Sequence, residues 1–250
     1  MISLYRKELS IFFSSLIGPL IISLFLLINS LLLWSSSENT NFLLNSFSIL
    51  ENTYASLDPF FSISPLIFLI FIPAVSMRAF SEEYNNGTIE ILITKPLSSY
   101  QIVLAKFLAI LTLVVMSLIP TSLYVTTIYL IGEIPGNLDL AGIMGSYIGL
   151  LMLSSVFISI SIFASSISKN QIIAFIFGIL ISAIFYFGFD LLSKIQALES
   201  IDLTVQKIGI SYHYKIMSKG VLLISDIVYF LSISFLFLKF SEIIIINKKK

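Results

Sequence analysis

The chain has 250 residues, of which 57% are hydrophobic and only 11% are charged, and its mean hydropathy is +1.02. Such a composition is typical of an integral membrane protein. The 14 basic and 14 acidic residues balance, and no basic patch with interleaved aromatic residues occurs, which argues against nucleic-acid binding. The absence of cysteine excludes disulfides, thiolate metal sites and cysteine nucleophiles.

Six long apolar stretches predict an all-α fold, a polytopic membrane protein whose single transmembrane domain occupies residues 1–250. The first stretch is too long for a removable signal peptide and lacks a small-residue cleavage site, so it is expected to stay as an anchor. The second is expected to begin with Ser64 as N-cap and Pro65 as first helical residue, and Pro73 and Pro120 are expected to kink the second and third. The six expected transmembrane helices cover residues 11–34, 65–85, 99–131, 140–167, 171–190 and 226–246.

A polar loop runs from Met77 to Ala109 between the second and third spans, and it carries dense charge and helix punctuation. Asn86 and Gly87 are expected to end the preceding helix, because Asn and Gly tolerate the left-handed conformation that closes a helix C-terminus. Thr88 is then placed to cap a short new helix, with Glu90 in its first turn, where the helix dipole favours a carboxylate. Pro96 stops this helix, and Ser98 with Gln101 forms a capping-box pattern that starts the third span.

The short helix of this loop carries one apolar stripe, because Ile89, Leu92 and Ile93 fall at i, i+3 and i+4. Two interpretations are open. The helix lies on the membrane surface, or it is offered to another protein. The stripe is small for a membrane anchor and sits among charges of both signs, which favours the second interpretation.

The polar segment 191–225 contains the single histidine of the chain, in the string Tyr212-His213-Tyr214. An interfacial aromatic cluster explains this histidine better than a metal site, because one histidine supplies one ligand where a site needs three or four. Two short surface helices are expected in the segment, over residues 201–208 and 212–219, with Gly209 and Gly220 as their C-caps.

Basic residues concentrate on one side of the expected spans, and the positive-inside rule places that side in the cytoplasm. Both termini and the loop at residues 81–100 are therefore expected in the cytoplasm, and segments 35–57 and 191–225 outside it. The cytoplasmic set comprises Arg6, Lys7, Arg78, Lys95, Lys106, Lys169, Lys239 and the lysines at 248–250, against Lys194, Lys207, Lys215 and Lys219 on the other side.

No acidic, basic or histidine side chain falls near the middle of an expected span, although an ion-coupled transporter usually needs such groups along its path. Coupling to an ion gradient is therefore not expected. The chain also lacks a G-x-x-x-x-G-K-[ST] phosphate loop, so ATP hydrolysis by that route, and hence a role as an enzyme, is not expected. No cofactor, catalytic or metal site is predicted, and the energy for any transport must come from another protein.

The string EEYNNGTIEILITKPLSSYQIVLAK closely resembles the loop between the first two core spans of ABC-2 type transporter permeases. The shape common to those loops is an acidic pair, then Gly-Thr-x-Glu, then a proline-containing stop and a lysine. In that family the loop contacts a separate ATPase subunit, which uses the ATP. The resemblance implies an ATPase-coupling role for Glu82, Glu83, Gly87, Thr88, Ile89, Glu90, Leu92, Ile93 and Pro96.

Further strings, among them FFSSLIGPLIISLFLLINSLLLW, FASSISKNQIIAF and FYFGFD, resemble the gliding-motility-associated ABC permease family over nearly the full length. The resemblance implies a permease subunit of an exporter in a bacterial inner membrane. Its implied partners are an ATPase, a second permease subunit that is a copy or a homologue, and the lipid bilayer. The alternative is a non-transporting anchor or assembly component of a motility or secretion machine, and the apolar spans do not separate the two.

Small residues spaced four apart mark helix faces that allow close backbone approach in lipid. One such face is expected on the first span and one on the fifth, and Gly145 with Gly149 shows the same spacing on the fourth. An equally simple explanation is that Gly and Ser are common in membrane helices. In ABC-2 type permeases the first and fifth spans meet across a dimer interface, so the resemblance implies a dimer face formed by Ser10, Ser14, Gly18, Ala174, Gly178 and Ser182.

Overall fold

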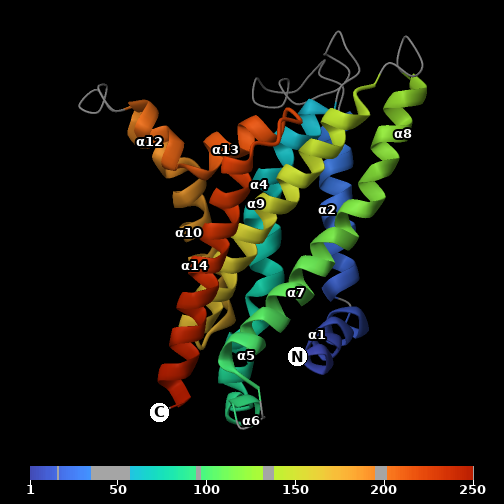
Figure 1. Cartoon of the computed structure of the whole chain (residues 1–250). Coiled ribbons are helices and arrows are strands. Elements are labelled where there is room, and N and C mark those ends of the chain that lie inside the picture. The colour runs from blue at the N-terminus through green and yellow to red at the C-terminus, as the bar shows by residue number, and fades with distance from the viewer. Residues whose placement is uncertain (16, 35–56, 94–96, 132–137, 195–201, 250) are drawn as a thin grey trace.

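The computed structural model of the chain describes residues 1–15, 17–34, 57–93, 97–131, 138–194 and 202–249 (Figure 1). All regular elements in these ranges are helices, so the predicted all-α fold is confirmed. The elements are α1 (Ile2–Ser14), α2 (Ile17–Trp34), α4 (Asp58–Ser76), α5 (Arg78–Asn85), α6 (Ile89–Ile93), α7 (Ser99–Leu118), η3 (Ile119–Thr121), α8 (Ser122–Ile131), α9 (Leu140–Ile167), α10 (Gln171–Ala183), η4 (Ile184–Gly188), α11 (Phe189–Ser193), α12 (Asp202–Ile208), α13 (Ile210–Met217) and α14 (Ile224–Lys249).

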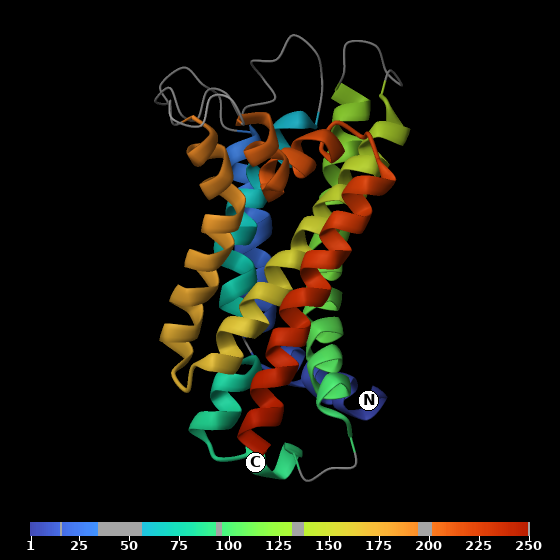
Figure 2. The same cartoon turned by 60° about the vertical axis from the view of Figure 1, so that its left-hand side comes forward.

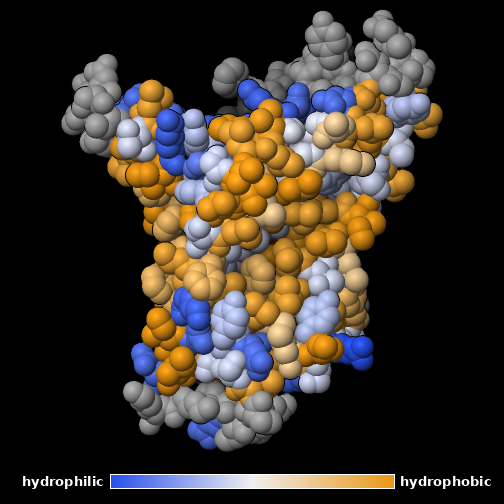
Figure 3. Space-filling model, viewed as in Figure 1, coloured by the Kyte–Doolittle hydropathy of each residue, from blue (hydrophilic) through white to orange (hydrophobic). Residues whose placement is uncertain are grey.

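Within the described residues, five helical segments are long and apolar enough to cross a membrane, and the bent pair α1–α2 raises the number to six. The five segments are Asp58–Asn85, Ser99–Leu130, Leu140–Ile167, Gln171–Ser193 and Ile224–Asn247. The surface fits this assignment, because hydrophobic side chains form a broad middle band and hydrophilic side chains gather at the two ends of the bundle (Figure 3).

The two ends of the bundle carry different elements. Both termini and the α5–α6 turn lie at one end, and α12 and α13 lie at the other (Figures 1 and 2). This arrangement matches the expectation that the termini and the loop at residues 81–100 share one side. We call the end with the termini the loop end.

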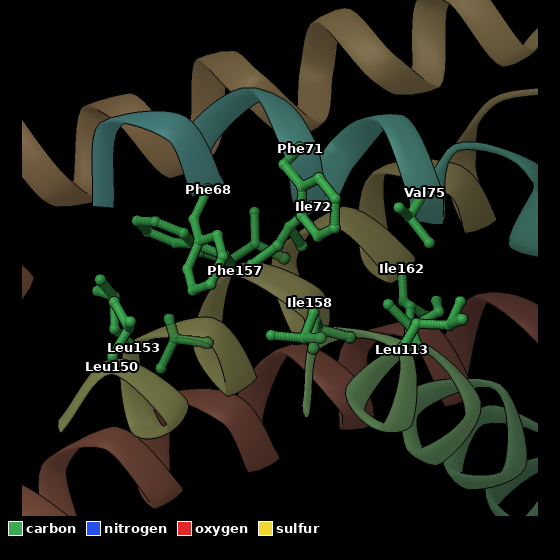
Figure 4. Close-up of a cluster of buried hydrophobic side chains, with 14 of the residues drawn as sticks. Phe68, Phe71, Ile72, Val75, Leu113, Leu150, Leu153, Phe157, Ile158 and Ile162 are labelled. Atoms are coloured by element: carbon green, nitrogen blue, oxygen red, sulfur yellow. The ribbon is translucent and has the colours of Figure 1, made fainter. Parts of the chain in front are cut away.

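Helix α9 forms the centre of the bundle, with 78% of its most apolar window buried inside the chain. It packs against α4, α7, α10 and α14. Phe68 and Ile72 of α4 point toward Leu153, Phe157 and Ile158 of α9 in the close-up of the core (Figure 4). In contrast, the same kind of window is 22% buried in the segment Gln171–Ser193, which begins with α10, and 33% buried in the segment Ile224–Asn247 of α14. These two segments therefore present most of their surface outward.

The expected first span over residues 11–34 is two helices, and their described parts are inclined by 68°. α1 ends at Ser14, and Ser15 has an extended backbone with ψ 148°. Gly18 lies at the corner, where an added Cβ would clash with the backbone carbonyl of Phe12. The prediction of one continuous helix was wrong. The Gly18-Pro19 pair at the corner is a break signal, and the prediction passed over it because the apolar pattern continues on both sides.

The second span also differs from the prediction, since α4 begins at Asp58 with Pro59 in its first turn, and Pro65 lies inside the helix. Proline has no backbone N–H, so Pro65 leaves the carbonyl of Phe61 without its usual partner one turn earlier. The Tyr214 hydroxyl of α13 donates to that carbonyl at 2.6 Å. The helix therefore passes through Pro65 because a side chain from another helix replaces the missing hydrogen bond.

Several local signals were predicted correctly. Ser98 and Gln101 form the capping box of α7, and the Asn170 side chain accepts from the N–H of Ile172 at the start of α10. Pro120 interrupts the third span with the 3-10 turn η3. Gly220 follows α13 with φ +81°, and Gly209 follows α12 directly, with its N–H donating to the Gln206 carbonyl at 2.9 Å. Gly209 has φ −77°, not the left-handed conformation of a typical glycine C-cap, and it is also the N-cap of α13.

His213 joins three helices at the end opposite the loop end. Its Nδ1 lies 2.7 Å from Oδ1 of Asp226 in α14, and its Nε2 lies 2.7 Å from the backbone oxygen of Lys207 in α12. The ring stacks on Tyr229 with 3.9 Å between ring centroids. The aromatic cluster expected around His213 is therefore present, with an additional carboxylate partner that the sequence did not indicate.

Tyr214→Phe tests whether the hydrogen bond from Tyr214 to the Phe61 carbonyl stabilises α4 at Pro65. Burial raises the pKa of Tyr214 well above its ordinary value, so the phenol remains a hydrogen-bond donor at neutral pH. Removing the hydroxyl leaves the Phe61 carbonyl unpaired, and we expect the free energy of unfolding to fall by about 1–3 kcal/mol. Thermal unfolding in detergent measures the change. Tyr129→Phe on the exposed surface of α8 is the control, and equal stability of the two variants would show that the contact contributes nothing.

Candidate coupling site

The loop that the sequence singled out begins with a sharp helix ending. The N–H of Asn86 donates to the Glu82 carbonyl at 2.9 Å, and Gly87 follows with φ +69°, in the left-handed region that favours glycine. α6 starts two residues later, and Glu90 lies in its first turn. The predicted order of helix end, turn and short second helix is present.

The apolar stripe of α6 does not face outward as predicted. Leu92 is only 4% exposed and belongs to the hydrophobic core of the chain, and Ile89 is half-buried against that core. The side chain of Ile93 and all of Pro96 lie outside the described residues. The stripe was expected to meet a partner, but the loop turns back under the bundle, so Leu92 packs against its own chain and loses its contact with water.

Among the loop side chains that the structure describes, the exposed ones from α5 to α6 are polar. Asn85, Asn86, Gly87, Thr88 and Glu90 are all exposed, and they form what we call the polar tip. The Thr88 hydroxyl lies 3.5 Å from the Glu83 carbonyl, at the limit of a hydrogen bond, so it stays close to the end of α5. A partner that approaches the loop end therefore meets amide, hydroxyl and carboxylate groups.

A buried charge cluster holds α5 in place. The Nζ of Lys106 in α7 lies 2.9 Å from Oε1 of Glu8 in α1 and 3.0 Å from Oε1 of Glu83 in α5. Lys106 is 2% exposed, and its ammonium also lies 5.1 Å from the centre of the Phe80 ring. A buried ammonium needs such partners because desolvation of an unpaired charge is strongly unfavourable. We call Glu8, Glu83 and Lys106 the ion triad.

The ion triad changes the reading of Glu83. The sequence pattern predicted that Glu82 and Glu83 together form an acidic pair that contacts a partner. Instead, Glu83 forms an ion pair with Lys106 inside the chain. Glu82 is half-buried beside it. The two partners of Lys106 could not be found from the sequence, although a lysine on the otherwise apolar α7 was a signal of a buried charge that needs a partner.

Ser165 of α9 connects the start of α5 to the centre of the bundle. Its hydroxyl accepts from the N–H of Phe80 at 3.0 Å and of Ser81 at 3.2 Å, and donates to the Met77 carbonyl at 2.9 Å. Met77 is the residue at which α4 ends and α5 begins. A serine from another helix thus satisfies the backbone groups that this break leaves free.

The small-residue face of α10 is used within the chain. Ala174, Gly178 and Ser182 are all buried. A Cβ added at Gly178 would lie 3.1 Å from Cβ of Pro73 in α4 and 3.5 Å from the Ser161 hydroxyl in α9. The prediction that this face meets a second copy was wrong, because close backbone approach is already required by α4 and α9.

The small-residue face predicted on the first span is not one continuous face, and the glycines of the fourth span pack within the chain. Ser14 is exposed at the end of α1, but Gly18 lies in α2 beyond the 68° corner, so the two residues share no helix face. On α9, a Cβ at Gly145 would meet the Gly220 backbone at 2.5 Å, and one at Gly149 would meet Cβ of Met217 at 2.7 Å. These glycines allow the turn after α13 to pack on α9.

Among the residues that the structure describes, no three histidine or carboxylate side chains come together in a way that could hold a metal ion. The polar groups described at the loop end form the exposed polar tip, and the ion triad and the Ser165 hydrogen bonds connect neighbouring helices in the interior.

Gly178→Leu is expected to destabilise the chain itself, because the larger side chain must displace Pro73 or Ser161. Overpacking a close contact costs about 1–3 kcal/mol or more, so membrane yield and thermal stability in detergent should both fall. Ile176→Leu, on the exposed side of the same helix, is the control and should change neither. Normal stability together with lost self-association would instead restore the dimer-face interpretation.

Lys106→Met tests the ion triad, because it leaves Glu8 and Glu83 buried without their cation. We expect a loss of about 3–5 kcal/mol in the free energy of unfolding, measured as thermal stability in detergent. The triple variant with Glu8→Gln and Glu83→Gln added should regain much of that loss. Lys169→Met, at an exposed lysine, is the control. A stable single variant would show that the cluster is not a structural link.

The family assignment covers almost the whole chain. A family model described as ABC-2 family transporter protein matches residues 3–245, which reach from α1 into the last turns of α14. No curated protein matches the chain. The matched family is the membrane component of a transporter and not a nucleotide-binding domain. With its apolar helices and the loop between α5 and α7, this chain belongs to the ABC-2 family of transporter proteins.

Proposed function

We propose that the chain is the permease subunit of an ABC-2 type ABC transporter, and that a separate ATPase subunit binds it at the polar tip. The observation that supports this most is the position of the tip. It is an exposed polar surface at the loop end, carried on a helix whose other sides are fixed to three neighbouring helices. The family match supports the transporter assignment, and the resemblance of the loop supports the ATPase partner.

The buried links suggest how a push on the tip would travel. Movement of α5 acts on α9 through Ser165, on α7 through Lys106, and on α1 through the shared contact of Lys106 with Glu8. In the proposed mechanism, ATP-driven closure of the partner moves α5 as a rigid body, and the linked helices shift with it. The chain itself carries out no chemical step.

The second permease subunit, a copy or a homologue, is proposed to bind the outward faces of the first and fifth spans. These faces carry large apolar side chains, such as Leu24 and Leu27 on α2 and Ile176 and Leu180 on α10. The resemblance to ABC-2 permeases favours this contact. It differs from the small-residue contact predicted from sequence, because the small residues of the fifth span already lie inside the bundle.

We further propose that the transporter is an exporter tied to gliding motility and lies in a bacterial inner membrane with both termini in the cytoplasm. The resemblance of the sequence and the basic residues at the loop end support this proposal. The alternative function is a membrane anchor that transports nothing. A co-purified ATPase whose activity depends on this chain favours transport, and a stable complex without such dependence favours the anchor.

Partner binding at the polar tip is tested by the double variant Thr88→Arg with Glu90→Lys. Both positions are exposed, so the yield of the chain should stay normal, while loss of a charge-assisted contact should weaken ATPase binding about tenfold or more. The measurement is pull-down of the ATPase from detergent, normalised to the membrane yield of the chain.

Two further variants control this experiment. Lys215→Glu changes a charge at the opposite end of the bundle and should leave pull-down unaffected. Leu92→Asp should lower the yield of the chain itself, because Leu92 is buried. Undiminished pull-down by the double variant would show that the ATPase binds elsewhere.

A further inference from the structure

A cavity of about 190 Å³ lies at the loop end between α1 and the junction of α4 with α5. It lies where the second span ends and beside the corner between α1 and α2, so it is at the boundary of the apolar band. Its walls are of two kinds. The apolar wall includes Ile11, Phe12, Ala74 and Val75, and the charged wall comprises Lys7, Glu8, Arg78, Glu82, Glu83 and Lys106.

The charged wall has no net charge, since it holds three basic and three acidic residues. The inner part, which is the ion triad, carries one more negative than positive charge. Lys7 and Arg78 supply positive charge beside it, and both are outside the triad. Glu82 and Glu83 would therefore repel a purely anionic ligand, and Lys7 and Arg78 would repel a purely cationic one.

Two buried polar atoms of this wall have no hydrogen-bond partner among the described residues. They are Oε2 of Glu83, which is an acceptor, and Nε of Arg78, which is a donor. Buried polar atoms in folded proteins are nearly always paired, so an unpaired acceptor and an unpaired donor on residues that line one cavity indicate a group that satisfies both. Such a group carries N–H donors at one point and anionic oxygens at another.

We propose that the cavity binds the phosphoethanolamine headgroup of a membrane lipid. The primary ammonium donates to Oε2 of Glu83, and the phosphate accepts from the guanidinium of Arg78. The lipid is favoured over free phosphoethanolamine because Phe12 and Val75 form an apolar wall and Ile11 is exposed at its rim, where the acyl chains continue into the bilayer. This inference does not depend on the proposed transport function.

The geometry also predicts a preference between lipids. A choline headgroup carries the same charges but has no N–H, so it cannot satisfy Glu83. A phosphatidylglycerol headgroup has no cation and places extra negative charge near two carboxylates. Phosphatidylethanolamine should therefore bind more tightly than either lipid with the same acyl chains, by about tenfold for the loss of one charge-assisted hydrogen bond.

Native mass spectrometry of the purified full-length chain measures this preference, with each lipid titrated separately from detergent. Free phosphoethanolamine is titrated in parallel. Glu83→Gln should abolish the preference for phosphatidylethanolamine over phosphatidylcholine, because the amide keeps a contact with Lys106 but removes the charge that attracts the ammonium. Arg78→Gln should weaken the binding of phosphatidylethanolamine and of phosphatidylcholine by a similar factor.

Ala74→Leu is a second kind of variant, which fills the cavity without altering any charge and should also reduce phosphatidylethanolamine binding. Lys169→Gln and Glu90→Gln remove exposed charges at the same end of the bundle and should leave binding unchanged. Equal binding of the ethanolamine and choline lipids, or a preference retained in Glu83→Gln, would overturn the proposal and leave water as the occupant. Stronger binding of phosphatidylglycerol, or of free phosphoethanolamine, would also overturn it.

Discussion

Hydrogen bonding of the backbone within the bilayer is the constraint on which this structure most depends. Lipid cannot bond to free N–H and C=O groups, so every break in a membrane helix needs a partner from the protein. In the span formed by α4 and α5, the breaks at Pro65 and at Met77 receive partners from other helices. Tyr214 supplies a donor at the first, and Ser165 supplies both a donor and an acceptor at the second. The irregular span is therefore tied to α13 at one end and to α9 at the other.

The loop end adds a second kind of link, which is electrostatic. Lys106 draws a carboxylate from α1 and one from α5 to the same buried point, and the Tyr5 hydroxyl lies 2.9 Å from the Thr112 hydroxyl nearby. Because the short helix α1 is bent away from α2, these contacts hold it against α7. The loop between α5 and α7 is thus a surface on a braced helix, and a force applied to it reaches the bundle through defined side chains.

Small residues mark the close contacts between helices of this bundle, whereas the outward faces carry large apolar side chains. Between helices in lipid there is little hydrophobic driving force, so close packing of small residues provides much of the association. Gly178 and Gly149 accordingly lie at close contacts between helices of the same chain. The outward faces of α10 and α14 instead carry large side chains such as Ile176 and Phe235, which suit contact with acyl chains or with another subunit.

Local sequence signals determined the helical class, the bounds of α9, the caps at Ser98 and Asn170, and the turn at Gly87, because each depends on residues within one or two helical turns. The tertiary structure alone decided which surface each face meets. The sequence pattern predicted that Leu92 would face a partner protein, but Leu92 is buried in its own chain. The pattern also predicted that Gly178 would contact a second copy, but Gly178 packs on Pro73 of the same chain. The tertiary structure also decided that α4 passes through Pro65, since the compensating Tyr214 lies 149 residues further along the chain. Periodicity identifies an apolar or small-residue face, but the partner of that face is fixed by contacts between distant segments, which no local pattern contains.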